Sequence, residues 1–236
     1  MSRIDYIREE EKKYHDYCYD NYKLFEKGSW LHKPVKTVME TLLLFDGMKN
    51  LNILDLGCGV GRNSIPLAEA VKEKDGNVVC VDLLDSALVK LNQYSEEYEV
   101  NDVIHTVKAD IGNFDIESNE FNYIIAISSL EHVQSEQIFE KVLQQMAEGT
   151  KDNGVNCIIV NSEVEEIDYE TSKVLEPLME VNLPTEEMLN KLKKIYEGWE
   201  TLKEIVKPLT FEIVRNERKV ILKTNAITYV VSKNFK

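Results

Sequence analysis

The chain has 236 residues, of which 43% are hydrophobic, and this length and composition suit one globular domain with a small cap. Its net charge of −14 disfavours a nucleic-acid partner, because a phosphate backbone is bound through clustered Lys and Arg. The sequence has no apolar run near the ~18 residues of a membrane span and no secretory signal, so we expect a cytoplasmic protein without a membrane partner. Its cysteines are too scattered for a metal site, so we expect no metal.

Helices are expected at the N-terminus, where residues 1–45 would form a helical cap. Residues 5–26 are polar and rich in tyrosine, and they read as one helix. A second helix runs from Pro34 to about Phe45. Its buried side should consist of Val35, Val38, Met39, Leu42 and Leu43.

The middle of the chain, residues 50–162, alternates apolar β-rich runs with helical patterns. Strands are expected at 51–57, 77–84, 103–110, 121–130 and 154–162. Helices are expected at 63–71, after Asp85 or Ser86, and from Ser135 to near Gly149. This alternation indicates βαβ units and a parallel sheet that is covered on both faces.

The C-terminal part differs in composition. Residues 163–184 are acidic, contain two prolines and read as a variable insert or cap; residues 185–236 begin with a helix at Thr185–Tyr196. Two β-rich runs, 201–215 and 220–233, then form a hairpin joined through 216–219. We therefore predict one domain over 1–236. Its α/β fold is Rossmann-like and doubly wound, with a mostly parallel seven-stranded sheet, an antiparallel C-terminal hairpin and an N-terminal helical cap.

The stretch "NILDLGCGVG" at 52–61 joins a strand to a helix through three glycines, as in many nucleotide-binding proteins. A dinucleotide can be accommodated only awkwardly, because Asp55 would repel a pyrophosphate and Arg62 occupies the third-glycine position of that fingerprint. A carboxylate at this turn favours a ligand with an ammonium and a sulfonium group.

These residues resemble the first motif of the class I S-adenosylmethionine-dependent methyltransferases. Asp82 matches the acid that the family places on the ribose hydroxyls, "ADIGNF" at 109–114 matches its adenine segment, and "ISSLEHV" at 127–133 matches the end of its fourth strand. The resemblance implies S-adenosylmethionine as cofactor. It implies these cofactor-binding residues: Trp30, Asp55, Gly57, Cys58, Gly59, Gly61, Asn63, Asp82, Leu83, Asp110, Ile111 and Ser128.

Simpler roles remain open for several of these residues. Asp55 and Asp82 could cap a helix or turn, Asp110 could start a turn before Gly112, and Trp30 could pack its helix onto the sheet. If the acceptor must lose a proton, the candidate general base is His132 or a nearby tyrosine, yet a histidine at a strand end is often packed rather than catalytic.

The end of the fourth strand narrows the class of acceptor. It lacks the Asn/Asp-Pro-Pro-aromatic motif typical of base and amide N-methylation, and the chain lacks a Pro-Cys pair. "GCGVGRNSIPLA" with "TEEMLNKLKKIYEGWE" resembles the tellurite-resistance branch of bacterial methyltransferases. We expect a small-molecule methyl acceptor, bound between the N-terminal segment and the insert after the fifth strand, and a monomer or homodimer. The alternatives are a non-catalytic cofactor-binding module and a dinucleotide-dependent oxidoreductase.

Overall fold

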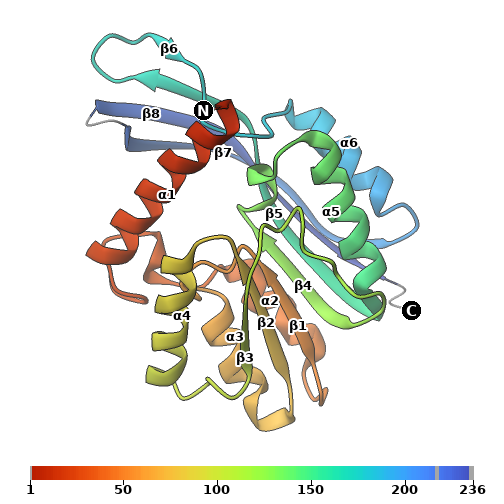
Figure 1. Ribbon diagram of the computed structural model, residues 1–236. Helices are drawn as coiled ribbons and strands as arrows, with labels where there is room; N and C mark the ends of the chain where they lie inside the picture. Colours follow the sequence, from red (N-terminus) through yellow and green to blue (C-terminus); the bar gives the residue numbers. More distant parts are fainter. Residues whose placement is uncertain (1, 216–217, 234–236) are drawn as a thin grey trace.

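The computed structural model describes residues 2–215 and 218–233, which form one α/β unit around a single sheet (Figure 1). The strands lie in the order β3-β2-β1-β4-β5-β8-β7, and the short β6 pairs with β5 beside this path. Pairing is parallel from β3 to β5 and antiparallel from β5 to β7. The predicted Rossmann-like fold is confirmed, with one small strand more than the seven expected.

The parallel half of the sheet follows the predicted alternation closely. Its strands are β1 (Asn52–Leu56), β2 (Asn77–Asp82), β3 (Ile104–Lys108), β4 (Phe121–Ile127) and the start of β5 (Thr150–Asp168). Its connecting helices are α3 (Ser64–Val71), α4 (Asp85–Glu97) and α5 (Glu136–Gly149), with 3-10 turns η3 (Lys72–Lys74) and η4 (Leu130–His132).

Helices cover both faces of this sheet, as the apolar strands require. On one face, Val38 of α2 (Lys36–Leu42), Ile65 of α3 and Leu91 of α4 belong to one buried cluster. On the other face, Phe139 of α5 and Leu192 of α6 (Thr185–Ile195) belong to a second. The strand order reverses between β1 and β4, so the carboxyl ends of these two strands flank the crevice where folds of this kind bind ligands.

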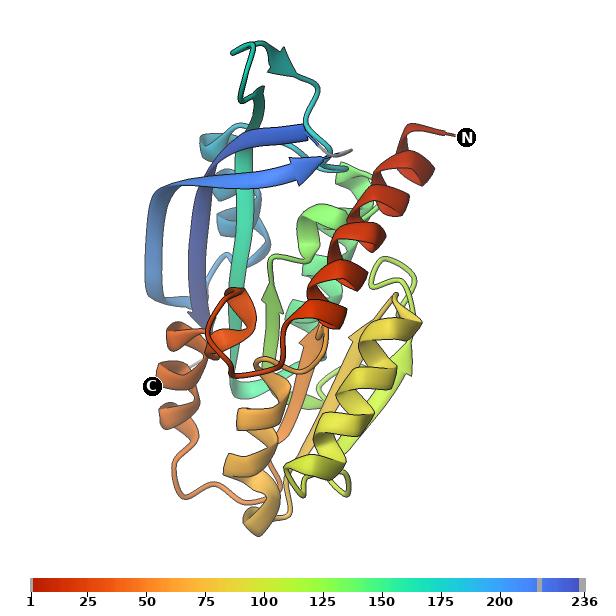
Figure 2. The same ribbon diagram turned by 90° about the vertical axis from the view of Figure 1, so that its left-hand side faces the viewer.

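The fifth strand is longer than predicted. It was expected at 154–162, but β5 continues to Asp168 because β8 (Arg218–Ser232) pairs with it through residues 165–168 and β6 (Val174–Leu175) pairs with its end. The first residues of the expected insert are therefore part of the sheet. We call this projecting part, residues 163–178 with the facing ends of β7 and β8, the sheet extension (Figure 2).

The last strand, β7 (Glu200–Arg215), lies at the edge of the sheet and pairs with β8 along its length, which confirms the predicted hairpin. Most of its residues are exposed. Asn216 and Glu217 of the expected hairpin connection lie outside the described residues.

The N-terminal cap consists of α1 (Arg3–Asn21), the 3-10 turns η1 (Trp30–His32) and η2 (Leu43–Phe45), and α2 between them. Helix α1 reaches from the sheet extension, where Arg3 pairs with Glu176 at 2.7 Å, to α4, where Lys90 pairs with Asp20 at 3.1 Å (Figures 1 and 2). The helical period placed Leu43 in the core, but it is 71% exposed because α2 ends at Leu42. Among the described residues, no helix is both long and apolar enough to cross a bilayer.

Candidate active site

The glycine turn after β1 is shaped by close packing. Gly57, Gly59 and Gly61 all have positive φ, at 78°, 54° and 94°. A Cβ on Gly57 would lie 2.4 Å from the Cβ of Ser129, and one on Gly61 would lie 2.4 Å from Leu91 Cδ1. These two glycines are therefore needed for contact with the end of β4 and with α4.

Asp82, at the end of β2, is joined directly to this turn. Its Oδ2 accepts a hydrogen bond from Gly59 N at 2.8 Å, and its Oδ1 accepts one from Leu84 N at 2.9 Å. Burial raises the pKa of Asp82, although both hydrogen bonds favour its carboxylate form. The next residue, Leu83, leaves an apolar side chain 41% exposed. The Asp82 carboxylate thus lies beside the backbone of the glycine turn and next in sequence to an exposed apolar side chain.

Asp55, Cys58 and Asn63 lie beneath or within the turn. Asp55 is 1% exposed and accepts a hydrogen bond from Ser64 Oγ at 2.6 Å, while burial raises its pKa to about 7. Asn63 Oδ1 accepts a hydrogen bond from Val35 N at 2.9 Å, and the thiol of Cys58 is buried. In this arrangement the three side chains support the turn and the approach of α2.

The other predicted residues lie at the same edge of the sheet, because parallel strands end together. Asp110 follows β3, and its Oδ1 accepts a hydrogen bond from Gly112 N at 2.9 Å, which is the turn considered as its simpler role. Its Oδ2 accepts one from Arg8 of α1 at 2.8 Å. Ile111 is buried beside it, while Ser128, after β4, is exposed with φ of 51°.

Helix α1 and η1 lie over the glycine turn. A Cβ on Gly59 would lie 3.1 Å from the hydroxyl oxygen of Tyr19, so this glycine faces α1. Trp30 is close to the turn, since the Arg62 guanidinium lies 5.0 Å from its ring centroid and donates a hydrogen bond to its carbonyl. His15 completes an aromatic cluster with Tyr19 and Trp30.

His132 lies in η4 within a group of buried charges. Its Nδ1 is 3.0 Å from Glu180 Oε2. Burial acts to lower the pKa of His132, but the bond to Glu180 and the nearby Glu11 and Glu131 outweigh it and raise the pKa to about 9. The imidazolium form is favoured at neutral pH, so the proposed role as a base requires this pair to separate.

The raised pKa of His132 makes a prediction for stability. Its contribution should be complete below pH 6.5, the ordinary value, and should be lost as pH rises toward about 9. The unfolding free energy of the wild type should therefore exceed that of His132→Gln by an amount that shrinks between these values. Urea unfolding at pH 6 to 9.5 measures this difference. A gap that stays constant over the range would contradict the charged pair.

Several buried polar atoms near His132 lack a hydrogen-bond partner among the described residues. Glu131 is fully buried; its Oε1 accepts hydrogen bonds from the backbone and side-chain nitrogens of Asn161, but its Oε2 has no partner. The same holds for Arg8 Nε, His15 Nδ1 and Arg215 Nε. Leaving such atoms unpaired costs free energy, so their grouping here indicates a place for a polar ligand or water.

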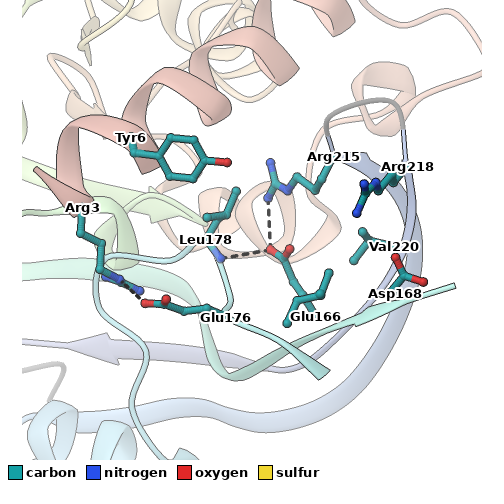
Figure 3. Close-up of a pocket in the computed structure, with 10 residues that line it drawn as sticks. Arg3, Tyr6, Glu166, Asp168, Glu176, Leu178, Arg215, Arg218 and Val220 are labelled. Carbon is teal, nitrogen blue, oxygen red and sulfur yellow. Dashed lines mark hydrogen bonds and ion pairs between the residues drawn. The ribbon is translucent and has the colours of Figure 1, made fainter. Parts of the chain in front are cut away.

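A cavity of about 490 Å³ opens between α1 and the sheet extension (Figure 3). Its lining residues are Arg3, Tyr6, Glu166, Asp168, Leu175, Glu176, Leu178, Arg215, Arg218 and Val220. They come from the N-terminal helix, from β5 and the segment after it, and from the hairpin. The sequence led us to expect the acceptor between the N-terminal segment and the insert after the fifth strand, and that expectation stays a prediction.

The sequence did not single out Arg8, Glu11, Glu131, Glu180 or Arg215. Four of them belong to α1, the insert and the hairpin, and only pairing across long sequence separations brings them together: Arg215 pairs with Glu11 at 2.7 Å and Arg8 with Glu180 at 3.7 Å. Glu131 gave the one available signal, an acid within the apolar run at the end of β4.

No group of three or more His, Cys, Asp or Glu suited to a metal occurs within the described residues.

The chain is similar to known methyltransferases in part of its sequence. Residues 53–154 match the family described as "Methyltransferase domain". The chain is 29% identical over 107 residues to a sterol 24-C-methyltransferase of Debaryomyces hansenii, and 29% identical over 103 residues to a ubiquinone biosynthesis O-methyltransferase of Hydrogenovibrio crunogenus. These matches cover 45% and 44% of the chain but only 27% and 41% of the two relatives.

The crystal structure of TehB from Haemophilus influenzae has a similar fold, with a TM-score of 0.64 at 21% identity over 93% of this chain and 67% of that one. The structural similarity spans nearly the whole chain, whereas the family match covers residues 53–154, from β1 into β5. Together, these comparisons identify a methyltransferase domain over residues 53–154, in a chain whose fold is similar to that of TehB.

Proposed function

We propose that this protein transfers the methyl group of S-adenosylmethionine to a small-molecule acceptor. The observation that supports this most directly is the joint placement of the glycine turn, the Asp82 carboxylate and the exposed Leu83 side chain at one edge of the sheet. The Asp82 oxygens suit the two ribose hydroxyls, and the apolar Leu83 with Ile111 suits the adenine ring. Gly59 has no side chain on the side facing α1, where a Cβ would lie 3.1 Å from the hydroxyl oxygen of Tyr19.

The cofactor, when bound, supplies an electrophilic methyl group on a positive sulfur. The protein's part is to hold the acceptor in line and to exclude water, and positioning of this kind contributes up to ~7–11 kcal/mol. Helix α1, with Tyr19 and Trp30, covers the turn on one side. Ser128 and η4 border it at the end of β4, where His132 and Glu131 would face the acceptor. The acidic surface supports a small-molecule acceptor over a nucleic acid.

Calorimetric titration of the full chain tests the cofactor assignment. S-adenosylmethionine and S-adenosylhomocysteine should bind with micromolar affinity, and NAD should not bind, because Arg62 occupies the position of the third glycine in a dinucleotide-binding fingerprint. Binding of NAD alone would replace the proposal with an oxidoreductase.

Turnover separates the enzyme from a non-catalytic module with the same site. With a suitable acceptor, the protein should convert S-adenosylmethionine to S-adenosylhomocysteine in multiple turnovers. Tight cofactor binding without turnover across a broad set of small acceptors would favour a sensor or scaffold.

A further inference from the structure

We propose that the cavity between α1 and the sheet extension binds the methyl acceptor, and that this acceptor is an organic anion, an oxyanion group on an apolar body. The inference rests on the proposed methyl transfer and specifies the substrate class of that site. Four features support it: the size of the cavity, its apolar wall, the state of its charged groups, and the charged side chains that link its wall to those near the end of β4.

The size and wall of the cavity fit an organic molecule. At about 490 Å³ it lies within the ~300–1,000 Å³ range of small-molecule sites and greatly exceeds the needs of one inorganic ion. Leu175, Leu178 and Val220 supply apolar surface, and the ring of Tyr6 lies at the α1 side (Figure 3). Such a wall favours a ligand with an apolar body.

All three acidic side chains of the lining are already engaged by donors of the protein. Glu166 accepts a hydrogen bond from Leu178 N at 3.2 Å and pairs with Arg215 at 3.5 Å. Glu176 pairs with Arg3 at 2.7 Å, and Asp168 accepts hydrogen bonds from the nitrogen and hydroxyl of Thr171, each at 2.7 Å. These acids have less capacity left for a cationic ligand.

Two arginines that line the cavity still have hydrogen-bond donors without a protein partner among the described residues. Arg218 is exposed, and its side chain makes no hydrogen bond or ion pair with any residue that the structure describes, although its charge helps to lower the pKa of Asp168. Arg215 is engaged by Glu11 and Glu166, yet its buried Nε has no partner in the described part of the chain. Unused donors on two guanidinium groups favour a carboxylate or phosphate.

Charged side chains link one wall of the cavity to the buried charges around His132. Behind Arg215 lies Glu11, whose pKa burial raises and His132, Arg215 and His15 lower, with a net decrease. His132 in turn pairs with Glu180. His15 Nδ1 and Glu131 Oε2, which lack a hydrogen-bond partner among the described residues, belong to this same interior. In this proposal, the reacting end of a ligand held by Arg218 and Arg215 therefore lies toward these groups and the end of β4.

The test uses pairs of probes that differ in charge: 4-hydroxyphenylacetate, octanoate and phenyl phosphate, each with a neutral amide or alcohol counterpart. Calorimetric titration into the full chain, with and without S-adenosylhomocysteine, should show binding of at least one anion, at least tenfold tighter than its counterpart. Arg218→Glu should weaken that binding at least tenfold, and Arg218→Lys should restore most of it. Affinity for S-adenosylmethionine should be the same in all variants.

Lys219→Glu is the matched control, because Lys219 is adjacent and exposed but faces the ring of Tyr169 rather than the cavity. It should change anion affinity less than twofold. Absence of binding by every anion, equal affinity for charged and neutral probes, or equal effects of the two charge reversals would overturn the proposal. Failure of S-adenosylmethionine to bind the wild type would instead remove the methyl-transfer function, and the anion titrations without cofactor would still decide what the cavity binds.

Discussion

Asp82→Ala is expected to weaken binding of S-adenosylmethionine by about 10- to 100-fold while the protein stays folded. A hydrogen bond to a charged group is worth about 1.5–3 kcal/mol, and each 1.4 kcal/mol is a tenfold change in affinity. The substitution removes the proposed ribose contact and also releases Gly59 N, which Asp82 Oδ2 fixes at 2.8 Å. Calorimetric titration with S-adenosylmethionine measures the loss, and circular dichroism checks the fold.

Asp85→Asn provides the control for this loss. Asp85 begins α4 three residues later, its side chain is 73% exposed, and it pairs with Lys108 on the surface. Removing its charge should leave cofactor affinity unchanged. Unchanged affinity in Asp82→Ala would exclude Asp82 from the cofactor site.

Gly57→Ala is expected to lower the unfolding free energy by about 2–5 kcal/mol. About 1–2 kcal/mol comes from placing a Cβ at positive φ, and about 1–3 kcal/mol comes from overpacking. The new methyl group would lie 2.4 Å from Ser129 Cβ. Ser129 cannot easily move, because its hydroxyl donates a hydrogen bond to Leu56 O at 2.6 Å and its side chain is buried. Urea unfolding at neutral pH measures the loss.

Gly47→Ala separates the two contributions. Gly47 has nearly the same φ, 79°, but a Cβ there would have no heavy atom of the described residues within 4 Å apart from its chain neighbours. Its loss should be limited to about 1–2 kcal/mol of backbone strain. Equal losses in the two variants would show that the end of β4 yields to the methyl group without cost.

The cofactor half of the site could be predicted because its geometry is local. In a parallel sheet the residue after each strand falls at the same edge, so Asp82, Asp110 and Ser128 converge whenever the strands are identified correctly. The glycine turn likewise depends on a few consecutive residues. The individual contacts of the site residues could not be predicted. Nothing in the sequence shows that Asn63 accepts a hydrogen bond from Val35 or that Arg8 pairs with Asp110.

The acceptor half could not be predicted because it depends on pairing between distant segments. The continuation of β5 to Asp168 is imposed by β8, which lies some fifty residues further along the chain. The acidic composition of 163–184 indicated a solvated cap, yet Glu166 is 2% exposed since Arg215 and Leu178 N satisfy it. The donors that satisfy a buried carboxylate come together only when the chain folds. The sequence pattern around that carboxylate therefore does not show that it is buried.

The exposed edge of β7 has a consequence for colloidal behaviour. A long unpaired strand edge is a template for adding strands from other molecules, and with time for aggregation. This edge is interrupted by Pro208, which has no N–H to donate, and by charged side chains at Lys203, Lys207 and Glu212. These residues make the addition of a strand from another molecule at this edge less favourable.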